Sequence, residues 1–193
     1  LLSIAERWKR RQAPSSRARP WRYLAAERLI PVDVLQSAVA QSLLRTGPGG
    51  SMWMAHTDNE GVLTGWEERG PDWRGFATDG VKVLFRLGDP KAYRLCVTEA
   101  AIDAMSLAAI EAMRSDTLYL STGGGWSPAT DAALRALAGR PRTTIVAATD
   151  NDVQGDVFAE RLRVLASDLD CDFERLRPTQ QDWNRDLGVM KST

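Results

Sequence analysis

The chain has 193 residues, of which 44% are apolar and 26% charged, and its formal net charge is zero. These values are typical of a folded globular protein, and every apolar run is far shorter than a bilayer crossing. Two cysteines and one histidine exclude a self-contained zinc ribbon. No signal peptide is visible, so we expect a reducing, cytoplasmic compartment with Cys96 and Cys171 as buried free thiols. Because the chain begins with Leu, we expect a piece of a longer protein.

The charge is unevenly distributed along the chain. Residues 1–50 carry nine Lys or Arg against three acids, which gives +6 and leaves −6 for residues 51–193. This split favours a polyanion or a metal ion as partner. Residues 1–20 are predicted to form a short basic helix and a flexible Pro/Ser/Arg linker, with Arg10 and Arg11 as candidate nucleic-acid contacts. The alternative is a solvated linker to a neighbouring domain.

Residues 21–91 are predicted to form a small α+β domain. "WRYLAAERL" and "VDVLQSAVAQSLL" have apolar residues at helical spacing, and "SMWMAHT" and "VLTGWEER" flank the turn "DNEG" as an antiparallel hairpin. "VKVLFRL" predicts one more strand. Three arginines of this strand region are candidate phosphate contacts, with solvated surface as the alternative: Arg69, Arg74 and Arg86. Trp53 and Trp66 are interpreted as packing residues, with base stacking as the alternative.

The pattern changes near residue 93, where apolar runs begin to alternate with helical segments. "YRLCVTE", "TLYLST", "TTIVAAT" and "CDFERLRP" are the expected strands, and Ser127 with Pro128 is expected to begin one of the helices. This alternation predicts a small α/β domain with a doubly wound, parallel sheet of about four strands flanked by helices. We expect that sheet within residues 93–178 of a domain that spans residues 92–193.

Acidic residues follow two of these strands. Glu99 follows the first, and Asp150 and Asp152 follow the third. Ligands of open α/β sheets bind at the carboxyl ends of the strands, and close carboxylates raise one another's pKa unless a cation is present. All-oxygen ligands suit Mg²⁺ or Mn²⁺. The sequence therefore predicts a divalent-metal site, although acids at strand ends also cap the helices that follow.

Other kinds of acidic site fit the sequence less well. "DNDVQGD" resembles the start of a calcium loop, but Arg161 stands where that loop needs a bidentate Glu, and the segment follows a strand. An aspartyl-phosphate enzyme usually places a lysine near its acids, and residues 92–190 contain none. An unrelated acid-cluster phosphohydrolase stays open as an alternative.

The quoted segments together resemble a known family. "VTEAAIDAMSL", "STGGGW" and "AATDNDVQGD" are similar to the TOPRIM domain shared by topoisomerases, primases and related nucleases. "QDWNRDL" is similar to the ending found in plasmid-type primases and mobilisation relaxase-associated proteins, and the preceding segment resembles the small domain that accompanies that version. Ala100 departs from the family, which usually has Gly after the Glu.

The resemblance implies roles for several residues. Asp150 and Asp152 would ligate Mg²⁺ or Mn²⁺, and Glu99 would ligate as well or act as general acid/base. Asp103 and Asp156 would lie just outside the metal ligands or stand as simple helix N-terminal acids. The glycine turn, Gly123 and Gly124, is a candidate phosphate contact.

The implied function is a module that acts on nucleic-acid phosphodiesters during DNA replication or plasmid transfer, by primer synthesis or by strand cleavage and rejoining. Its expected partners are nucleic acid, in particular single-stranded DNA, and other domains of a longer polypeptide. A topoisomerase-like reaction also needs a nucleophilic tyrosine, and Tyr23, Tyr93 and Tyr119 all lie away from the acidic motif in sequence. The alternative is a non-catalytic nucleic-acid-binding or regulatory TOPRIM module.

Overall fold

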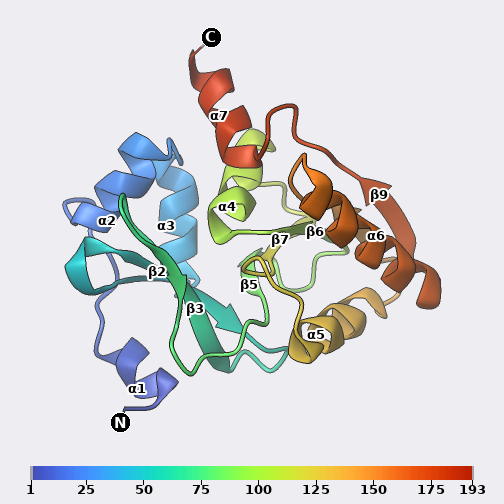
Figure 1. The fold of residues 1–193 in the computed structure, drawn as a ribbon, viewed down its shortest axis with the longest axis horizontal. Helices are drawn as coiled ribbons and strands as arrows, with labels where there is room; N and C mark the ends of the chain where they lie inside the picture. The colour runs from blue at the N-terminus through green and yellow to red at the C-terminus, as the bar shows by residue number, and fades with distance from the viewer. Residues whose placement is uncertain (1, 193) are drawn as a thin grey trace.

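Two sheets lie side by side in the computed structural model, which describes residues 2–192 (Figure 1). The first sheet is antiparallel, with strand order β1-β2-β3-β4. Its strands are β1 (Leu44–Thr46), β2 (Met52–Thr57), β3 (Leu63–Arg69) and β4 (Arg74–Phe76). Its helical segments are α1 (Ile4–Lys9), α2 (Arg19–Arg22), the π-helical turn η1 (Tyr23–Glu27), α3 (Val32–Ala40) and the 3₁₀ turn η2 (Pro48–Gly50).

The expected hairpin is present. β2 and β3 pair antiparallel, with Ala55 opposite Trp66. The Asp58 side chain accepts hydrogen bonds from the backbone N–H groups of Glu60 and Val62, at 3.0 and 2.8 Å, and so stabilises the turn. The first domain therefore has the antiparallel strands that the sequence predicts.

The second sheet has strand order β5-β7-β6-β8-β9, in which β5 is antiparallel and the other four strands are parallel. The strands are β5 (Phe85–Gly88), β6 (Arg94–Thr98), β7 (Thr117–Ser121), β8 (Thr144–Ala147) and β9 (Asp172–Arg175). The helices are α4 (Ala101–Ile110), α5 (Pro128–Ala138), α6 (Val153–Asp168) and α7 (Trp183–Ser192). Ser127 caps α5 through its hydroxyl, with Pro128 at the first helical position, as predicted. β5 comes from "VKVLFRL", so the chain enters the second sheet before residue 93.

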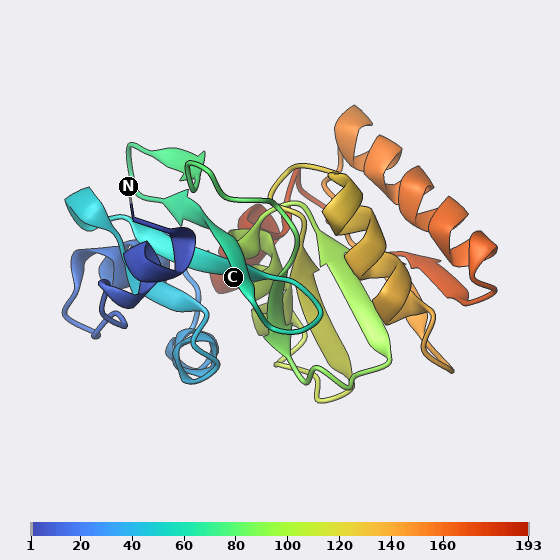
Figure 2. The same ribbon diagram turned by 90° about the horizontal axis from the view of Figure 1, so that it is seen from below.

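Helices cover both faces of the second sheet, which explains why its strands read as continuous apolar runs. Leu95 and Val97 face α5 and α6, whereas Cys96, between them, faces α4 and α7. α5 and α6 lie on the side that points away from the first sheet (Figure 2). Cys96 and Cys171 are both free thiols, and Cys171 is only partly buried.

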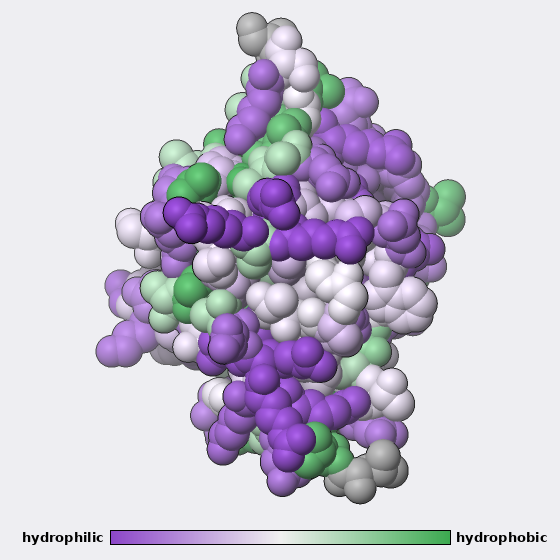
Figure 3. Space-filling view, turned by 90° about the vertical axis from the view of Figure 1, so that its left-hand side faces the viewer, coloured by the Kyte–Doolittle hydropathy of each residue, from purple (hydrophilic) through white to green (hydrophobic). Residues whose placement is uncertain are grey.

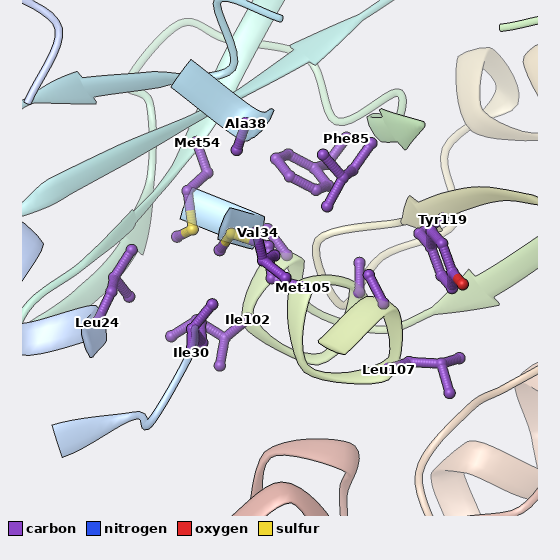
Figure 4. Close-up of a cluster of buried hydrophobic side chains, with 14 of the residues drawn as sticks. Leu24, Ile30, Val34, Ala38, Met54, Phe85, Ile102, Met105, Leu107 and Tyr119 are labelled. Atoms are coloured by element: carbon purple, nitrogen blue, oxygen red, sulfur yellow. The ribbon is translucent and has the colours of Figure 1, made fainter. Parts of the chain in front are cut away.

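One hydrophobic core runs from the first domain into the second (Figure 4). Leu24, Val34 and Met54 of the first domain belong to the same buried cluster as Ile102 and Met105 of α4. Burial of this apolar surface stabilises the two domains together. The cleft described below therefore lies between parts that share a core.

The basic N-terminal segment begins with the expected short helix, α1, but this helix is packed against the first sheet, contrary to the expectation of a flexible, solvated segment. Trp8 of α1 stacks on Trp53, and Trp53 stacks on Trp66 with ring centroids 4.0 Å apart. The guanidinium groups of Arg7 and Arg11 lie over Trp66 and Trp53, at 5.0 and 5.2 Å. The expectation failed because both tryptophan partners lie more than forty residues from α1 in the sequence. Figure 3 shows the side of the molecule that lies to the left in Figure 1, where hydrophilic side chains gather around the N-terminal end of the chain.

Among the residues that the structure describes, none of the helices combines the length and the apolar composition that a membrane crossing requires.

Candidate functional site

A cleft of about 740 Å³ opens between the first domain and the carboxyl ends of β6 and β8. Both domains line it; most of the acidic side chains come from the second domain and most of the basic ones from the first. The acidic side chains are Glu67, Glu99, Asp103, Asp150 and Asp182. The basic side chains are Arg28, Arg69, Arg74, Lys82 and Arg185. Carboxylates and cations that face the same space suit a ligand that combines a metal ion with phosphate groups.

We call the acidic side chains at the carboxyl ends of β6 and β8 the acidic wall, and the basic side chains that face them the basic wall. Glu99 and Asp150 form the centre of the acidic wall. They follow the adjacent parallel strands β6 and β8, and the backbone N–H of Asp150 donates to Glu99 Oε1 at 3.2 Å. Burial, with the charges of Glu99 and Asp182, raises the pKa of Asp150 to about 7. Burial also raises the pKa of Glu99, and the charge of Asp152 adds to this effect. Glu99 and Asp150 thus lie together at one edge of the sheet, where the sequence predicted them.

Asp103 lies in the cleft, in the first turn of α4, with only 7% of its surface exposed. Burial and the charges of Asp150 and Asp182 raise its pKa well above the ordinary value, which favours the neutral acid. Asp103 Oδ1 accepts a hydrogen bond from the backbone N–H of Asn184 at 3.2 Å. Asp103 therefore connects α4 to the "DWN" segment.

The "DWN" segment fixes Asp182 at the cleft. The indole N–H of Trp183 donates to the Ala148 carbonyl at 2.7 Å, and the Asn184 amide donates to the Arg28 carbonyl and Ser106 Oγ at 2.7 and 3.0 Å. These hydrogen bonds of Trp183 and Asn184 fix the segment, and the preceding Asp182 lies in the cleft lining. Asp182 is not among the site residues predicted from the sequence, although its place at the start of "DWN" was the available signal.

Two of the predicted arginines and two unpredicted cations form most of the basic wall. Arg69 of β3 and Arg74 of β4 line the cleft as proposed, together with Lys82 and Arg28. Lys82 lies over the Phe76 ring at 5.6 Å, and Arg28 lies over Tyr23 at 5.3 Å and donates to the Tyr23 hydroxyl at 2.8 Å. Arg28 belongs to the basic stretch of residues 1–50, but local sequence did not place it or Lys82 in the cleft, because their positions depend on how the two domains pack.

The structure places other predicted residues outside the cleft lining. Asp152 is exposed and caps α6, with Oδ1 accepting from the Gly155 N–H at 2.8 Å. Asp156 pairs with Arg177 at 2.6 Å, and the Arg177 hydrogen bond lowers the pKa of Asp156. Arg86 donates to Asn59 Oδ1 and the Thr57 carbonyl at 2.7 and 3.2 Å, so its guanidinium group is engaged by the hairpin loop.

Arg10 and Arg11 also lie outside the cleft lining, directly after the end of α1. Arg10 is exposed, whereas Arg11 is partly buried over Trp53. The Arg10 side chain therefore faces solvent, whereas the Arg11 side chain helps to pack the N-terminal segment against Trp53.

The glycine turn lies beside Glu99. Gly123 and Gly124 both line the cleft and have φ values of +66° and +67°, a region that glycine occupies without steric cost. The Gly124 N–H donates to the Glu99 carbonyl at 2.6 Å, so this turn fixes the backbone at Glu99. The Gly123 N–H donates to Ser121 Oγ at 3.0 Å, so the backbone N–H groups of both glycines are already used and neither is free for the predicted phosphate contact.

The acidic wall has the chemistry of a divalent-cation site. Oδ1 of Asp150 is buried and, within residues 2–192, has no hydrogen-bond partner. Glu99 lies next to it. Burial raises the pKa of both groups, and the charges of neighbouring acids add to this effect, Glu99 and Asp182 on Asp150 and Asp152 on Glu99; a bound cation relieves such repulsion. As the side chains stand, no three acidic, His or Cys groups in residues 2–192 are arranged to hold a metal ion. The donor types fit Mg²⁺ or Mn²⁺, and ligation would require side-chain rearrangement.

Family models match both domains. Residues 96–187 match a family described as Toprim-like, and residues 22–92 match one described as a protein of unknown function (DUF3991). No curated protein sequence matches the chain. Residues 96–187 are therefore similar to a TOPRIM domain, and they follow a small domain, as the sequence motifs predicted.

Solved primase structures have a similar fold. The zinc-binding and RNA polymerase domains of the Aquifex aeolicus primase match with a TM-score of 0.58 and 12% identity, over 99% of this chain and 61% of that one. The RNA polymerase domain of the Mycobacterium tuberculosis primase gives 0.55 and 15%, over 92% and 76%. The primase fragment of the bacteriophage T7 primase-helicase gives 0.51 and 16%, over 82% and 69%. At these identities the similarity establishes a shared fold.

Proposed function

We propose that this chain is the catalytic module of a nucleic-acid-processing protein with primase-like activity. The observation that carries the proposal is the interdomain cleft, in which the carboxylates after β6 and β8 face the arginines of β3 and β4. A nucleoside triphosphate and a nucleic-acid strand both present phosphate groups to such a surface. The solved structures of similar fold, which are primase fragments, support the same class.

Glu99, Asp150 and Asp152 are the proposed ligands of Mg²⁺ or Mn²⁺, with Asp182 close enough to support them. A bound divalent ion would polarise a phosphoryl oxygen and lower the barrier to phosphodiester chemistry. Asp152 would have to exchange its capping bond for the metal, whereas Asp150 already offers an unbonded oxygen. Glu99 can also hold or release a proton, since its raised pKa brings it nearer to neutral pH.

The basic wall is proposed to hold the phosphate groups of the substrate. Arg69 and Arg74 each present a planar guanidinium group that suits bidentate phosphate binding, and Lys82 adds a compact charge. Single-stranded DNA is the proposed template, as the resemblance implies. By the same resemblance, we propose that the chain is part of a plasmid or mobile-element primase or relaxase-associated protein.

The direct test is primer synthesis on single-stranded DNA with ribonucleoside triphosphates and Mg²⁺ or Mn²⁺. The matched variants are Asp150→Asn, in the cleft, and Asp156→Asn, outside it. We expect loss of product for Asp150→Asn and no change for Asp156→Asn. If the wild-type chain makes no product but binds single-stranded DNA and Mn²⁺, the non-catalytic TOPRIM module becomes the better description. Metal-dependent release of phosphate from a small phosphomonoester, without polymerisation, would favour the phosphohydrolase.

A further inference from the structure

A buried carboxylate of the first domain reaches the second domain beside the candidate site. Glu67 of β3 is 4% exposed and lines the cleft. Its Oε1 accepts from Ser121 Oγ at 2.6 Å and lies 2.9 Å from His56 Nε2. Its Oε2 accepts from the backbone N–H of Ala101 at 2.9 Å. A buried carboxylate costs free energy unless it is fully hydrogen-bonded, and these contacts supply the donors.

The contacts of His56 show which group carries the charge. The Val83 N–H donates to His56 Nδ1 at 3.2 Å, so Nδ1 is an acceptor and the ring proton is on Nε2. Nε2–H then donates to Glu67. Burial raises the pKa of Glu67, but the hydrogen bond and charge interaction with His56, together with the hydrogen bonds from Ser121 and Ala101, outweigh it and lower that pKa. Glu67 is therefore an anion that accepts a hydrogen bond from the His56 ring.

The partners of Glu67 in the second domain lie on either side of Glu99. Ala101 is the first residue of α4, and the preceding Ala100 has no side chain that could cap the helix. Ser121 ends β7, and its Oγ also accepts from the Gly123 N–H at 3.0 Å. The carboxylate thus fixes the two backbone segments next to Glu99: the start of α4 and the glycine turn.

Glu67 also belongs to β3, the strand that carries Arg69 of the basic wall. Alternate residues of a strand share a face, and Glu67 and Arg69 both line the cleft. Glu68, between them, contacts the Ser51 hydroxyl and lines a different hollow. The side chain that holds the start of α4 is therefore two residues from a proposed phosphate ligand.

We propose that Glu67 is a positioning residue, which sets the spacing between the acidic wall at Glu99 and the basic wall at Arg69. The inference rests on the proposed function, because it concerns a ligand that contacts both walls. A metal ion that binds the acids alone does not need this spacing, whereas a metal–triphosphate ligand does. Loss of the carboxylate should therefore weaken triphosphate binding much more than metal binding.

The experiment compares Glu67→Gln with Glu68→Gln, its neighbour on the opposite face of β3. The probes are Mn²⁺ alone, followed by proton relaxation, and Mg²⁺ with ATP or GTP, followed by calorimetry on the full chain. For Glu67→Gln we expect at most a twofold change in the Mn²⁺ Kd and about a tenfold weaker Kd for the triphosphate, since one charge-assisted hydrogen bond contributes on this scale. Glu68→Gln should change neither. Unchanged triphosphate binding in a folded Glu67→Gln protein, or equal weakening of both ligands, would overturn the proposal.

Amide hydrogen exchange separates this inference from the proposed function. In Glu67→Gln we expect faster exchange at Ala101, Gly123 and Gly124, with the later turns of α4 still protected. If the wild-type chain binds neither probe, the proposed function fails, and exchange alone decides whether Glu67 fixes the backbone around Glu99. Uniform exchange across α4, or no change at these amides, contradicts the positioning role.

Discussion

The guanidinium group of Arg175 donates a hydrogen bond to the main-chain carbonyl of Asp150 at 3.1 Å. It also donates to the carbonyls of Ala147 and Thr149 at 2.8 and 3.0 Å. One side chain at the end of β9 therefore holds the backbone that leaves β8 and carries Asp150. Its positive charge also lowers the pKa of both Glu99 and Asp150, although burial outweighs it.

Replacing Arg175 should disturb this loop. We expect Arg175→Met to lower the free energy of unfolding by about 1–3 kcal/mol, because partly buried carbonyls lose their donor. Mn²⁺ binding should weaken as Asp150 loses its fixed position. Urea unfolding and proton relaxation check the two effects. Arg177→Met is the matched control, since its contacts to Asp156 and Asn151 are at the surface. Equal effects of both variants would contradict a special role for Arg175.

The raised pKa of Asp150 predicts how stability depends on pH without divalent cations. Its pKa of about 7 exceeds the ordinary value of 3.8, so the folded state binds more protons between these values. Stability should therefore fall as pH rises from about 4 to 7. Asp150→Asn should flatten this fall and stabilise the protein at pH 8 by about 1–2 kcal/mol, less than the full shift implies because the group is partly exposed. Urea unfolding in EDTA from pH 5 to 8 measures both effects; a variant less stable than wild type at pH 8 is the contrary result.

Asp152 offers a substitution that separates metal binding from folding. Its present contact is the cap of α6, and Asn caps a helix about as well as Asp. We therefore expect Asp152→Asn to leave the Tm nearly unchanged while weakening Mn²⁺ binding about tenfold or more, as for loss of a ligand. Thermal unfolding and relaxation titration are the measurements. An unchanged Mn²⁺ affinity would remove Asp152 from the ligand set and leave Glu99, Asp150 and Asp182 as the acids to consider.

Nucleic-acid binding by the N-terminal segment should be tested by charge removal, because α1 is part of the packed structure. Lys9 and Arg10 are exposed, and replacing both by Gln should leave the Tm unchanged. If both contact phosphate, the log–log salt slope for single-stranded DNA should flatten by about 1.4. Binding at several salt concentrations gives the slope; an unchanged slope identifies these residues as solvated surface. Deletion of residues 1–12 is the contrasting variant, and we expect it to lower the Tm by exposing Trp53 and Trp66.

Local sequence predicted the acidic half of the cleft better than the basic half. Glu99 and Asp150 could be placed together because parallel strands bring their carboxyl ends to one side of a sheet. Arg28 and Lys82 reach the cleft only through the packing of one domain on the other, which no local pattern reports. The position of Glu67 had the same cause, since its partners Ser121 and Ala101 lie far along the chain.

The place of β5 has a consequence for any attempt to produce the TOPRIM domain alone. The Toprim-like match begins at residue 96, whereas Phe85–Gly88 pairs with β7. A fragment cut between the two matched families would leave one side of β7 with unpaired N–H and C=O groups along the apolar run "TLYLS". Such an open edge invites pairing between molecules. The outer strand β9, "DFER", carries charges that discourage this, so self-association would proceed through the newly exposed β7 edge.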